Sequence, residues 1–444
     1  MPITSSSKNE IVVRMDSNDA DNKSGNLYVR AKPSNIDSST ITLYVFKFAR
    51  IGNDYDTLDA KSFDIELMTD GKAFVTFTRD HQVPPYYAKG GDGNVSSDDY
   101  STYRIKEATS YNNSAPNGYN NGGRVDPAFY TCVALYGNYS YMGTCIDEWT
   151  GPPGTVIKWT LLNETVNYHD REVDGNWAGS RLVNSNINTH KNGRISIRKT
   201  GGGNGYIYYF IFDDDSRAAS PVKKVRLASI TLSAYNTLTQ SQFAVVDNTN
   251  NPSDSLSMAL KSTGHPIMFY HTSGNNSLNI AYNTTTYTPN TFTKRVVKSN
   301  GGKFNNVAIN TNLILLAYQN SANSLEVGSL TDETDTTLST LVIEDGSKEG
   351  ITGVQTSVAF GTSTAFITYL NNVFLNTTKG IRLAYFSGAS FTEANLVNST
   401  YWQYMIIPSP VALNYERTVV KWDGTKPVIA YKGNNYIYVV RLIQ

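Results

Sequence analysis

Short apolar runs separated by polar turns recur along the whole chain, and one pattern of run, turn and run repeats. In each copy a strand-like run ends in an aromatic residue, a polar turn follows, and a second apolar run returns. The clearest copy has the runs Pro266–Tyr270 and Leu278–Tyr282 around the turn 271–277. Such runs between turn residues predict β-hairpins. Further copies begin at Ala73, Phe129, Tyr206, Leu313, Ala365 and Pro427.

The aromatic residues that end the first run of each copy are spaced at an average of about 59 residues. Seven units of this size nearly fill the chain, and a single small sheet cannot bury both of its faces, whereas a ring of sheets can. The repeat therefore predicts an all-β fold, a seven-bladed β-propeller made by residues 1–444. The marker residues are Phe77, Tyr136, Phe212, Tyr270, Tyr318, Tyr369 and Tyr431.

Strand-like runs also precede the first marker, and they leave two domain arrangements open. The last hairpin runs almost to Gln444 and needs a further strand, which one of these early runs would supply by closing the ring. The alternative is an N-terminal β-sandwich domain over residues 1–125 followed by a six-bladed propeller over 126–444. The early runs are Ile11–Met15, Leu27–Arg30, Ile41–Phe48 and Asp64–Met68.

The composition agrees with an all-β chain. Charged residues make up 17% of the sequence, below the roughly 25% that is usual, and Asn, Ser, Thr, Gly and 30 tyrosines take their place. No stretch combines strong helix formers with apolar residues at helical spacing. Strands and turns are therefore expected throughout.

The charge balance and the N-terminus narrow the choice of partners and location. Lysine and arginine (38) equal aspartate and glutamate (38), so no bulk charge recruits nucleic acid. No run reaches the length of a membrane span, and the N-terminal residues lack the basic start and apolar run of a Sec signal peptide. We therefore expect neither membrane insertion nor Sec targeting, although the surface composition is like that of adhesins and virion proteins.

The segment 84–124 interrupts the repeat with Gly, Asn, Ser and Tyr, including Tyr86 and Tyr87. Loops of this length are uncommon inside compact domains and are usually functional or disordered. Its tyrosines argue against disorder, which is normally poor in aromatic residues. We interpret the segment as an inserted long loop that orders against a neighbouring protein, in an oligomer or an assembly.

Cys132 and Cys145 lie symmetrically about Asn138 and Tyr139. A two-residue hairpin turn at that centre would place the two cysteines opposite each other on adjacent strands. A cross-strand disulfide is one alternative. Two separate thiols are the other, because the sequence does not fix the strand register.

Two copies of the repeat contain a recognisable strand motif, in Gly264–Tyr270 and Asp423–Tyr431. The second reads Asp-Gly-Thr-Lys-Pro-Val-Ile-Ala-Tyr. It resembles the D-G-x-P-x-I-A-Y strand of bacterial and phage β-propellers of the sialidase-like and lectin types. The resemblance extends over residues 200–444 and implies architecture only, since propellers serve as hydrolases, lectins and scaffolds. The chain lacks the repeated Asp boxes of sialidases.

Metal and phosphate sites receive little support. The five histidines are scattered, and two cysteines do not make a zinc site. The glycine-rich stretch 201–205 precedes a strand, so we interpret it as a turn and not as a phosphate loop. Asp213 and Asp215 follow that strand and are weak candidate ligands for a hard cation, against the simpler interpretation of a solvated turn. We therefore predict no cofactor and no metal.

The densest cluster of polar residues lies at 168–177. Glycoside hydrolysis needs two carboxyl groups, one acid and one base or nucleophile, and Asp170, Glu172 and Asp174 would supply them in an enzyme. The alternative is an ordinary charged loop. Aromatic rings offer flat platforms for sugars or protein partners. The candidate ligand-binding residues are Trp149, Trp177, Tyr168, His169, Tyr86 and Tyr87.

The sequence as a whole favours a recognition or structural propeller without catalytic activity. The most concrete form of this prediction is a phage or virus virion component, such as a tail, fibre, nozzle or capsid-decoration protein. Its expected partners are other virion or surface proteins and cell-surface glycans, and its expected location is the virion or the cell exterior. The alternatives are a glycan-cleaving propeller enzyme and a secreted lectin.

Overall fold

The computed structural model describes the chain in segments. They are residues 3–7, 10–15, 27–33, 41–51, 62–78, 86–90, 103–107, 128–137, 139–146, 154–161, 180–181, 189–214, 222–233, 237–283, 291–346, 351–372, 380–407, 417–433 and 436–442. Side chains in several of the strands before residue 193 lie outside this description. Within the described part, no helix has the length and apolar character needed to cross a membrane.

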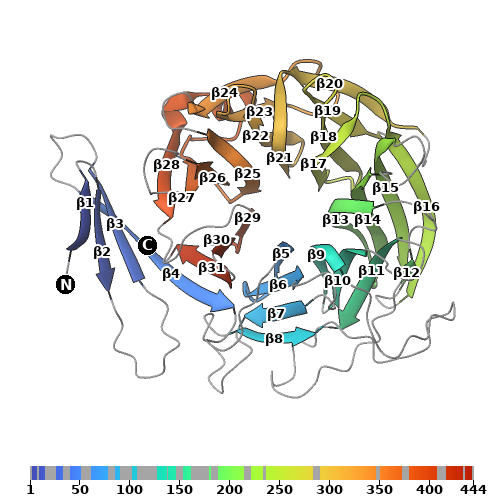
Figure 1. Cartoon of the computed structure of the whole chain (residues 1–444), viewed down its shortest axis with the longest axis horizontal. Coiled ribbons are helices and arrows are strands. Elements are labelled where there is room, and N and C mark those ends of the chain that lie inside the picture. Colours follow the sequence, from blue (N-terminus) through green and yellow to red (C-terminus); the bar gives the residue numbers. More distant parts are fainter. Residues whose placement is uncertain are drawn as a thin grey trace.

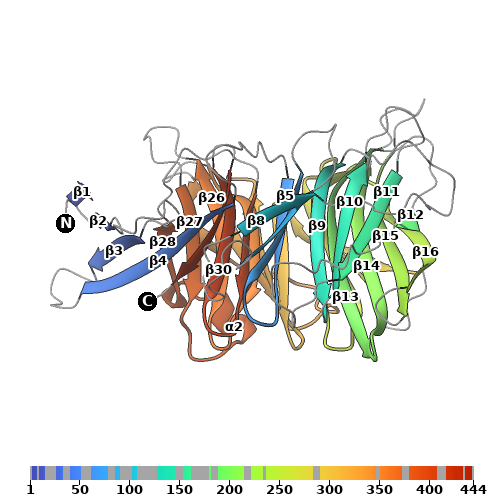
Figure 2. The ribbon, with the colours of Figure 1, turned by 90° about the horizontal axis from the view of Figure 1, so that it is seen from below.

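The described strands form antiparallel sheets that stand side by side around a central axis (Figure 1). Figure 2, a view from the side, shows these sheets with their strands running along the axis. The first four-stranded sheet consists of β5 (Ser62–Leu67), β6 (Ala73–Thr78), β7 (Tyr86–Gly90) and β8 (Tyr103–Glu107). The next consists of β9 (Ala128–Tyr136), β10 (Tyr139–Ile146), β11 (Gly154–Leu161) and β12 (Ser180–Arg181).

Four more four-stranded sheets continue the ring. They consist of β13 (Thr189–Gly201), β14 (Asn204–Asp214), β15 (Lys223–Ser233) and β16 (Thr237–Asp247); β17 (Pro252–Leu260), β18 (Pro266–Thr272), β19 (Ser277–Tyr282) and β20 (Thr293–Ser299); β21 (Gly301–Asn310), β22 (Leu313–Asn320), β23 (Leu325–Leu330) and β24 (Ser339–Glu344); and β25 (Ile351–Phe360), β26 (Ala365–Asn372), β27 (Gly380–Phe386) and β28 (Trp402–Ile407).

The last sheet joins the two ends of the described chain. From the centre outward it contains β29 (Thr418–Trp422), β30 (Pro427–Gly433), β31 (Tyr436–Leu442), β4 (Ile41–Ile51), β3 (Leu27–Pro33), β2 (Glu10–Met15) and β1 (Ile3–Ser7). Strand β4 pairs with β31 from Ile51 opposite Ile437 to Phe46 opposite Leu442. The strand next to the C-terminal hairpin is therefore β4, from the N-terminal part of the chain.

The innermost strands close the ring. Each of β5, β9, β13, β17, β21, β25 and β29 contacts the next, and β29 contacts β5. This arrangement confirms the prediction of an all-β propeller.

The core lies between the faces of neighbouring sheets. The second strands β18 and β30 are buried along their whole length, which explains why each begins with five consecutive apolar or aromatic residues instead of an alternating pattern. The marker side chains Tyr270, Tyr318, Tyr369 and Tyr431 all lie on second strands and are fully buried. The recurring tyrosines are thus core residues and not binding platforms.

Two sequence predictions about strands are corrected by the structure. The marker Tyr136 lies on the innermost strand β9, whereas the other markers lie on second strands. The segment 84–124 is not one long loop, because it contains the outer strands β7 and β8. Their short sequences, YYAKG and YRIKE, are less apolar than those of inner strands, so no apolar run marks them in the sequence.

The disulfide alternative is also corrected. The β9–β10 turn is centred one residue earlier than the cysteine pair requires, so Cys132 lies opposite Gly143 and Cys145 lies opposite Tyr130. The thiol of Cys132 is buried and forms no disulfide in the described part of the chain. Diagonal neighbours on adjacent strands are roughly 7–8 Å apart, beyond the usual disulfide span. The alternative of separate thiols agrees with this register.

Candidate functional site

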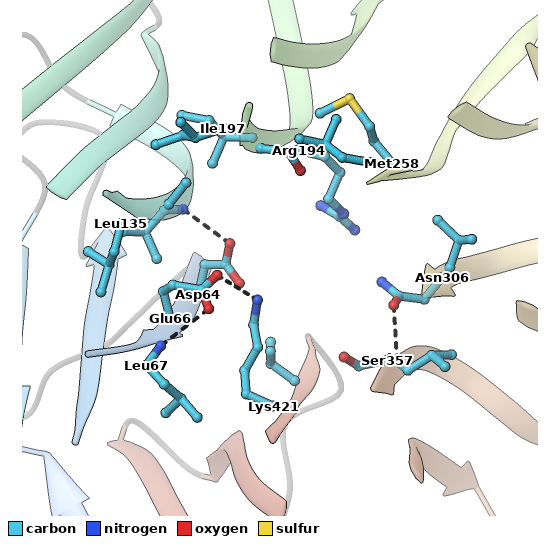
Figure 3. Close-up of a pocket in the computed structure, with 18 of the residues that line it drawn as sticks. Asp64, Glu66, Leu67, Leu135, Arg194, Ile197, Met258, Asn306, Ser357 and Lys421 are labelled. Atoms are coloured by element: carbon cyan, nitrogen blue, oxygen red, sulfur yellow. Dashed lines mark hydrogen bonds and ion pairs between the residues drawn. The ribbon is translucent and has the colours of Figure 1, made fainter. Parts of the chain in front are cut away.

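The central axis of the propeller holds a cavity of about 440 Å³ (Figure 3). All the innermost strands from β5 to β29 contribute side chains to its wall. Aliphatic residues alternate with polar ones along these strands, most of the surface that faces the cavity is polar, and the described part of the wall contains no aromatic ring. The charged and polar residues of the wall are Asp64, Glu66, Arg194, Ser196, Lys199, Asn306, Ser357, Arg417 and Lys421.

Polar side chains occur on these strands because an innermost strand has no paired strand on its central edge. Its backbone N–H groups need other acceptors, since an unpaired buried donor is costly. The N–H of Val358 donates to Asn306 Oδ1 at 3.0 Å, and the N–H of Val420 donates to Ser357 Oγ at 3.0 Å. Each acceptor belongs to the preceding sheet, so these bonds connect consecutive sheets around the cavity.

A recurring β-bulge sets the position of these acceptors. Phe304 and Gln355 begin corresponding bulges in β21 and β25 with positive φ angles of 52° and 53°. The hydroxyl groups of Thr356 and Thr418 donate to the carbonyl oxygens of Phe304 and Gln355, respectively, and thereby fix each innermost strand against the one before it. The bulge is a general device for re-aiming side chains at a sheet edge.

Two ion pairs cross from β5 to the last sheet, where the ring closes. Asp64 Oδ1 accepts from Arg417 Nη2 at 3.0 Å, and Arg417 also donates to the carbonyl oxygen of Phe63 at 3.0 Å. Asp64 Oδ2 accepts from the N–H of Val133 at 3.2 Å, so this carboxylate connects three sheets. Glu66 and Lys421 form the second ion pair, at 2.7 Å.

The second pair affects the titration of the lysine. Burial lowers the pKa of Lys421, but the neighbouring carboxylates of Glu66 and Asp64 outweigh burial and raise it overall. Lys421 is therefore a cation at neutral pH. Both described carboxylates of the wall are engaged by cations in this way.

Arg194 enters the cavity from β13 (Figure 3). Burial, followed by repulsion from Arg417, lowers the pKa of Arg194 to about 10. The lowered pKa shows that its charge is energetically unfavourable at this place, although the side chain is still protonated at neutral pH. Lys199, a further wall residue, lies over the ring of Tyr136 with Nζ 5.2 Å from the ring centre.

The described wall carries an excess of positive charge. Four cations, namely Arg194, Lys199, Arg417 and Lys421, face two carboxylates, whereas the whole chain has equal numbers of each sign. A concave site lined by an excess of one sign of charge concentrates the field of those charges. The cavity is therefore suited to a small anionic ligand.

The residues predicted from sequence lie elsewhere or outside the described chain. Tyr86 and Tyr87 lie on the outer-layer strand β7, and Asp213 is buried in an ion pair with Arg226 at 2.6 Å. In the described ranges, no group of His, Cys, Asp and Glu is arranged to hold a metal ion. The residues outside the description are Trp149, Tyr168, His169, Asp170, Glu172, Asp174, Trp177 and Asp215.

Sequence reasoning missed the whole cavity. A usable signal was present, because charges interrupt otherwise apolar strands at Asp64 and Glu66 in β5 and at Lys421 in β29. A charge inside such a strand needs a partner, and the partner of Asp64 lies 353 residues away. Asp64 and Arg417 come together only when the ring closes.

Comparisons with known proteins give distant likeness in structure alone. No protein-family model and no curated protein sequence matches the chain. The sialidase of Trypanosoma rangeli is 10% identical with a TM-score of 0.43, and the match covers 70% of this chain and 54% of the sialidase. The chain thus spans about half the length of that enzyme.

Two other solved structures give similar values. The Aleuria aurantia lectin, in a complex with α-methyl-L-fucoside, is 10% identical with a TM-score of 0.42, covering 80% of this chain and 97% of the lectin. A thermostable family-43 glycoside hydrolase is 12% identical with a TM-score of 0.36, covering 64% of this chain and 92% of the hydrolase. Likeness at this distance does not assign a function.

Proposed function

We propose that this protein is a recognition module that binds a small anionic ligand in the central cavity of the propeller, without cleaving it. The observation that carries the proposal is the excess of cations in the wall, four against two carboxylates among the described residues. A bound anion would offset the repulsion between Arg194 and Arg417 that contributes to the lowered pKa of Arg194.

The ligand class that we propose is an acidic saccharide. A volume of about 440 Å³ lies within the range of small-molecule sites. The cations would hold the carboxylate or sulfate group, and the amide of Asn306 and the hydroxyls of Ser196 and Ser357 are groups that hydrogen bond to sugar hydroxyls. The aliphatic wall would cover the apolar side of the sugar.

Binding without cleavage is supported by the state of the carboxylates. Glycoside hydrolysis requires one carboxyl group that can donate a proton and a second that acts as base or nucleophile. In the described wall, Asp64 accepts from Arg417 and Val133, and Glu66 accepts from Lys421. Both are thus committed to ion pairs across the ring closure.

A combined binding and cleavage assay tests the proposal. A glycan array should show binding to acidic glycans and not to their neutral counterparts, and incubation with the bound polysaccharide should release no reducing ends. The variant Arg194→Ala should lose array binding. Lys303→Ala should keep it, because Lys303 lies exposed on β21 outside the cavity wall. Release of reducing ends that depends on Asp170 or Glu172 would overturn the proposal.

For the architecture, we infer that the sheets are seven blades of one ring and that β4 completes the last blade. The support is that the innermost strands of seven described sheets contact one another in sequence and line one cavity. Deleting residues 41–51 should therefore destabilise the whole molecule. Independent unfolding of an N-terminal domain and an intact propeller would favour the six-bladed alternative.

For the biological setting, we infer attachment or assembly in a phage or virus virion. The support is the composition, rich in Tyr, Asn, Ser and Thr and with 17% charged residues. Tail or portal genes beside the coding gene would agree with this setting. A neighbourhood of secreted polysaccharide-degrading enzymes would contradict it.

A further inference from the structure

The central cavity is elongated along the axis of the propeller, because its wall follows the innermost strands for much of their length. On β13 the wall residues extend from Arg194 to Lys199, and on the last sheet they extend from Arg417, just before β29, to Lys421. Strands rise about 3.3 Å per residue, so these stretches are about 13–17 Å long. A volume of about 440 Å³ over such a length leaves a mean cross-section on the order of 30 Å². The cavity is therefore longer than it is wide.

The first group of wall charges lies near the beginning of β5. Arg417 contacts Asp64 there at 3.0 Å. Arg194 lies close to this pair, since both of its members affect the pKa of Arg194 after burial has lowered it. We call these three residues the first level of the cavity.

A second group of wall charges lies further along the same strands. Lys421 contacts Glu66 at 2.7 Å, and Glu66 is two residues beyond Asp64 on β5, a distance of about 7 Å. Because Arg417 meets Asp64 and Lys421 meets Glu66, β29 and β5 run in the same direction. The second pair is thus displaced along the axis from the first.

Lys199 lies on the same side as this second pair. The strands of each sheet alternate in direction and short connections join consecutive sheets, as from Asp247 to Pro252, so β13 runs in the direction of β5. Lys199, five residues beyond Arg194, is both exposed and part of the wall, and its Nζ lies 5.2 Å from the ring centre of Tyr136. The cavity therefore opens to solvent at this end.

The two levels carry the same balance of charge in the described part of the wall. The first level consists of Arg194, Arg417 and Asp64, and the second level consists of Lys199, Lys421 and Glu66. Each has two cations and one carboxylate, and therefore a net charge of one positive unit. A ligand with a single anionic group offsets only one of these, whereas two anionic groups spaced along the axis offset both.

We propose that the ligand is an acidic oligosaccharide that lies lengthwise in the cavity, with one anionic group at the first level and another at the second level. This inference rests on the proposed anion site and adds the length of the ligand and the spacing of its charges. The cations of the two levels are separated by about 7–17 Å along the strands, which is more than one carboxylate spans. Acidic residues of one sugar chain would reach both levels, and the open end beside Lys199 would let the chain continue outside.

Isothermal titration calorimetry with oligomers of one sugar tests the proposal. The probes are glucuronate, the trimer of β-1,4-linked glucuronate, and cellotriose, which is the same trimer without carboxylates. The glucuronate trimer should bind at least about tenfold more tightly than the monomer, the value of one further charge-assisted hydrogen bond within a linked ligand. Cellotriose should bind more weakly than the glucuronate trimer by at least the same factor.

Variants of the exposed end separate the two levels. Lys199→Ala should lower the ratio of trimer affinity to monomer affinity about tenfold, because the monomer has no second carboxylate to lose. Lys199→Gln, which keeps the length of the side chain, should have the same effect, and circular dichroism checks that both variants fold. Lys303→Ala is the control and should leave the ratio unchanged, because Lys303 is exposed on β21 outside the wall.

The possible outcomes distinguish this proposal from the one on which it rests. If glucuronate binds and its trimer binds no more tightly, the anion site stands and the lengthwise ligand is refuted. A ratio that is unaffected by both Lys199→Ala and Lys199→Gln would refute it as well, and so would cellotriose binding as tightly as the acidic trimer. If neither the monomer nor the acidic trimer binds, the anion site itself is refuted.

Discussion

Replacing Asp64 removes the carboxylate that connects three sheets at the point where the ring closes. The variant Asp64→Ala leaves Arg417 without its ion-pair partner and the N–H of Val133 without its acceptor. The two charged side chains are largely buried, with 11% of Asp64 and 15% of Arg417 exposed. Glu66→Ala is the matched control, because the Glu66 and Lys421 side chains are 29% and 32% exposed.

The magnitudes of the two substitutions should differ clearly. Removing one partner of a buried ion pair costs about 3–5 kcal/mol, and water in the cavity can recover part of this by solvating Arg417. We therefore expect Asp64→Ala to lower the free energy of unfolding by about 2–4 kcal/mol. For the more exposed pair, Glu66→Ala should cost about 0–1 kcal/mol. Asp64→Asn keeps an acceptor for Val133 and should lie between them.

Urea unfolding at pH 7 measures these differences. Tryptophan fluorescence and far-ultraviolet circular dichroism should give coincident transitions, which is the condition for comparing free energies. If Asp64→Ala and Glu66→Ala differ by less than about 0.5 kcal/mol, the ion pair does not hold the ring closure and the reasoning is refuted.

Three further predictions concern the core, the thiol and pH. Tyr431→Ala should lower the free energy of unfolding in urea by about 3–5 kcal/mol, because Tyr431 is fully buried and its ring centre lies 5.3 Å from that of Tyr438, on which it stacks. Tyr404→Ala is the control and should lower it by about 1 kcal/mol or less, because Tyr404 is 39% exposed. Equal losses for the two variants would contradict the assigned core. A reducing agent should leave the melting temperature unchanged, because Cys132 forms no disulfide, and a clear drop would indicate that one is present. Burial lowers the pKa of His271 in the folded state, so its contribution to stability is complete above the unfolded value of 6.5 and declines as the pH falls below it. The urea midpoint should therefore fall less from pH 7 to pH 5 in His271→Gln than in the unmodified protein, and equal falls would show that His271 does not contribute.

The elements that were predictable from sequence are those whose signal is local. Hairpins such as Pro266–Tyr282 show as two apolar runs around a polar turn, because the inner strands of each sheet are buried on both faces. The outer strands β7 and β8 have short, polar sequences, so their pattern resembles that of a loop. The pairing of Cys132 with Cys145 was not predictable, because the position of the turn is not fixed by the sequence. A shift of the turn by one residue moves the partner of Cys132 by two positions.

The candidate site was not predictable in the same way. Its wall takes one or more side chains from every innermost strand, so residues far apart in sequence meet only after the ring has closed. The ion pair between Asp64 and Arg417 depends on β29 contacting β5, a contact that no local pattern contains. A charge within an apolar strand indicates that a partner exists, and the fold identifies which residue it is.

Isothermal titration calorimetry with glucuronate and glucose tests the central proposal most directly, because the two sugars differ by one carboxylate. The proposal predicts that the protein binds glucuronate more tightly than glucose, and that added salt weakens this preference. It predicts that Arg194→Ala lowers the affinity for glucuronate by about 10- to 100-fold, the value of one charge-assisted hydrogen bond, while Lys303→Ala leaves it unchanged. Equal binding of the two sugars, or glucuronate binding that is unaffected by Arg194→Ala, would contradict an anion site in the central cavity.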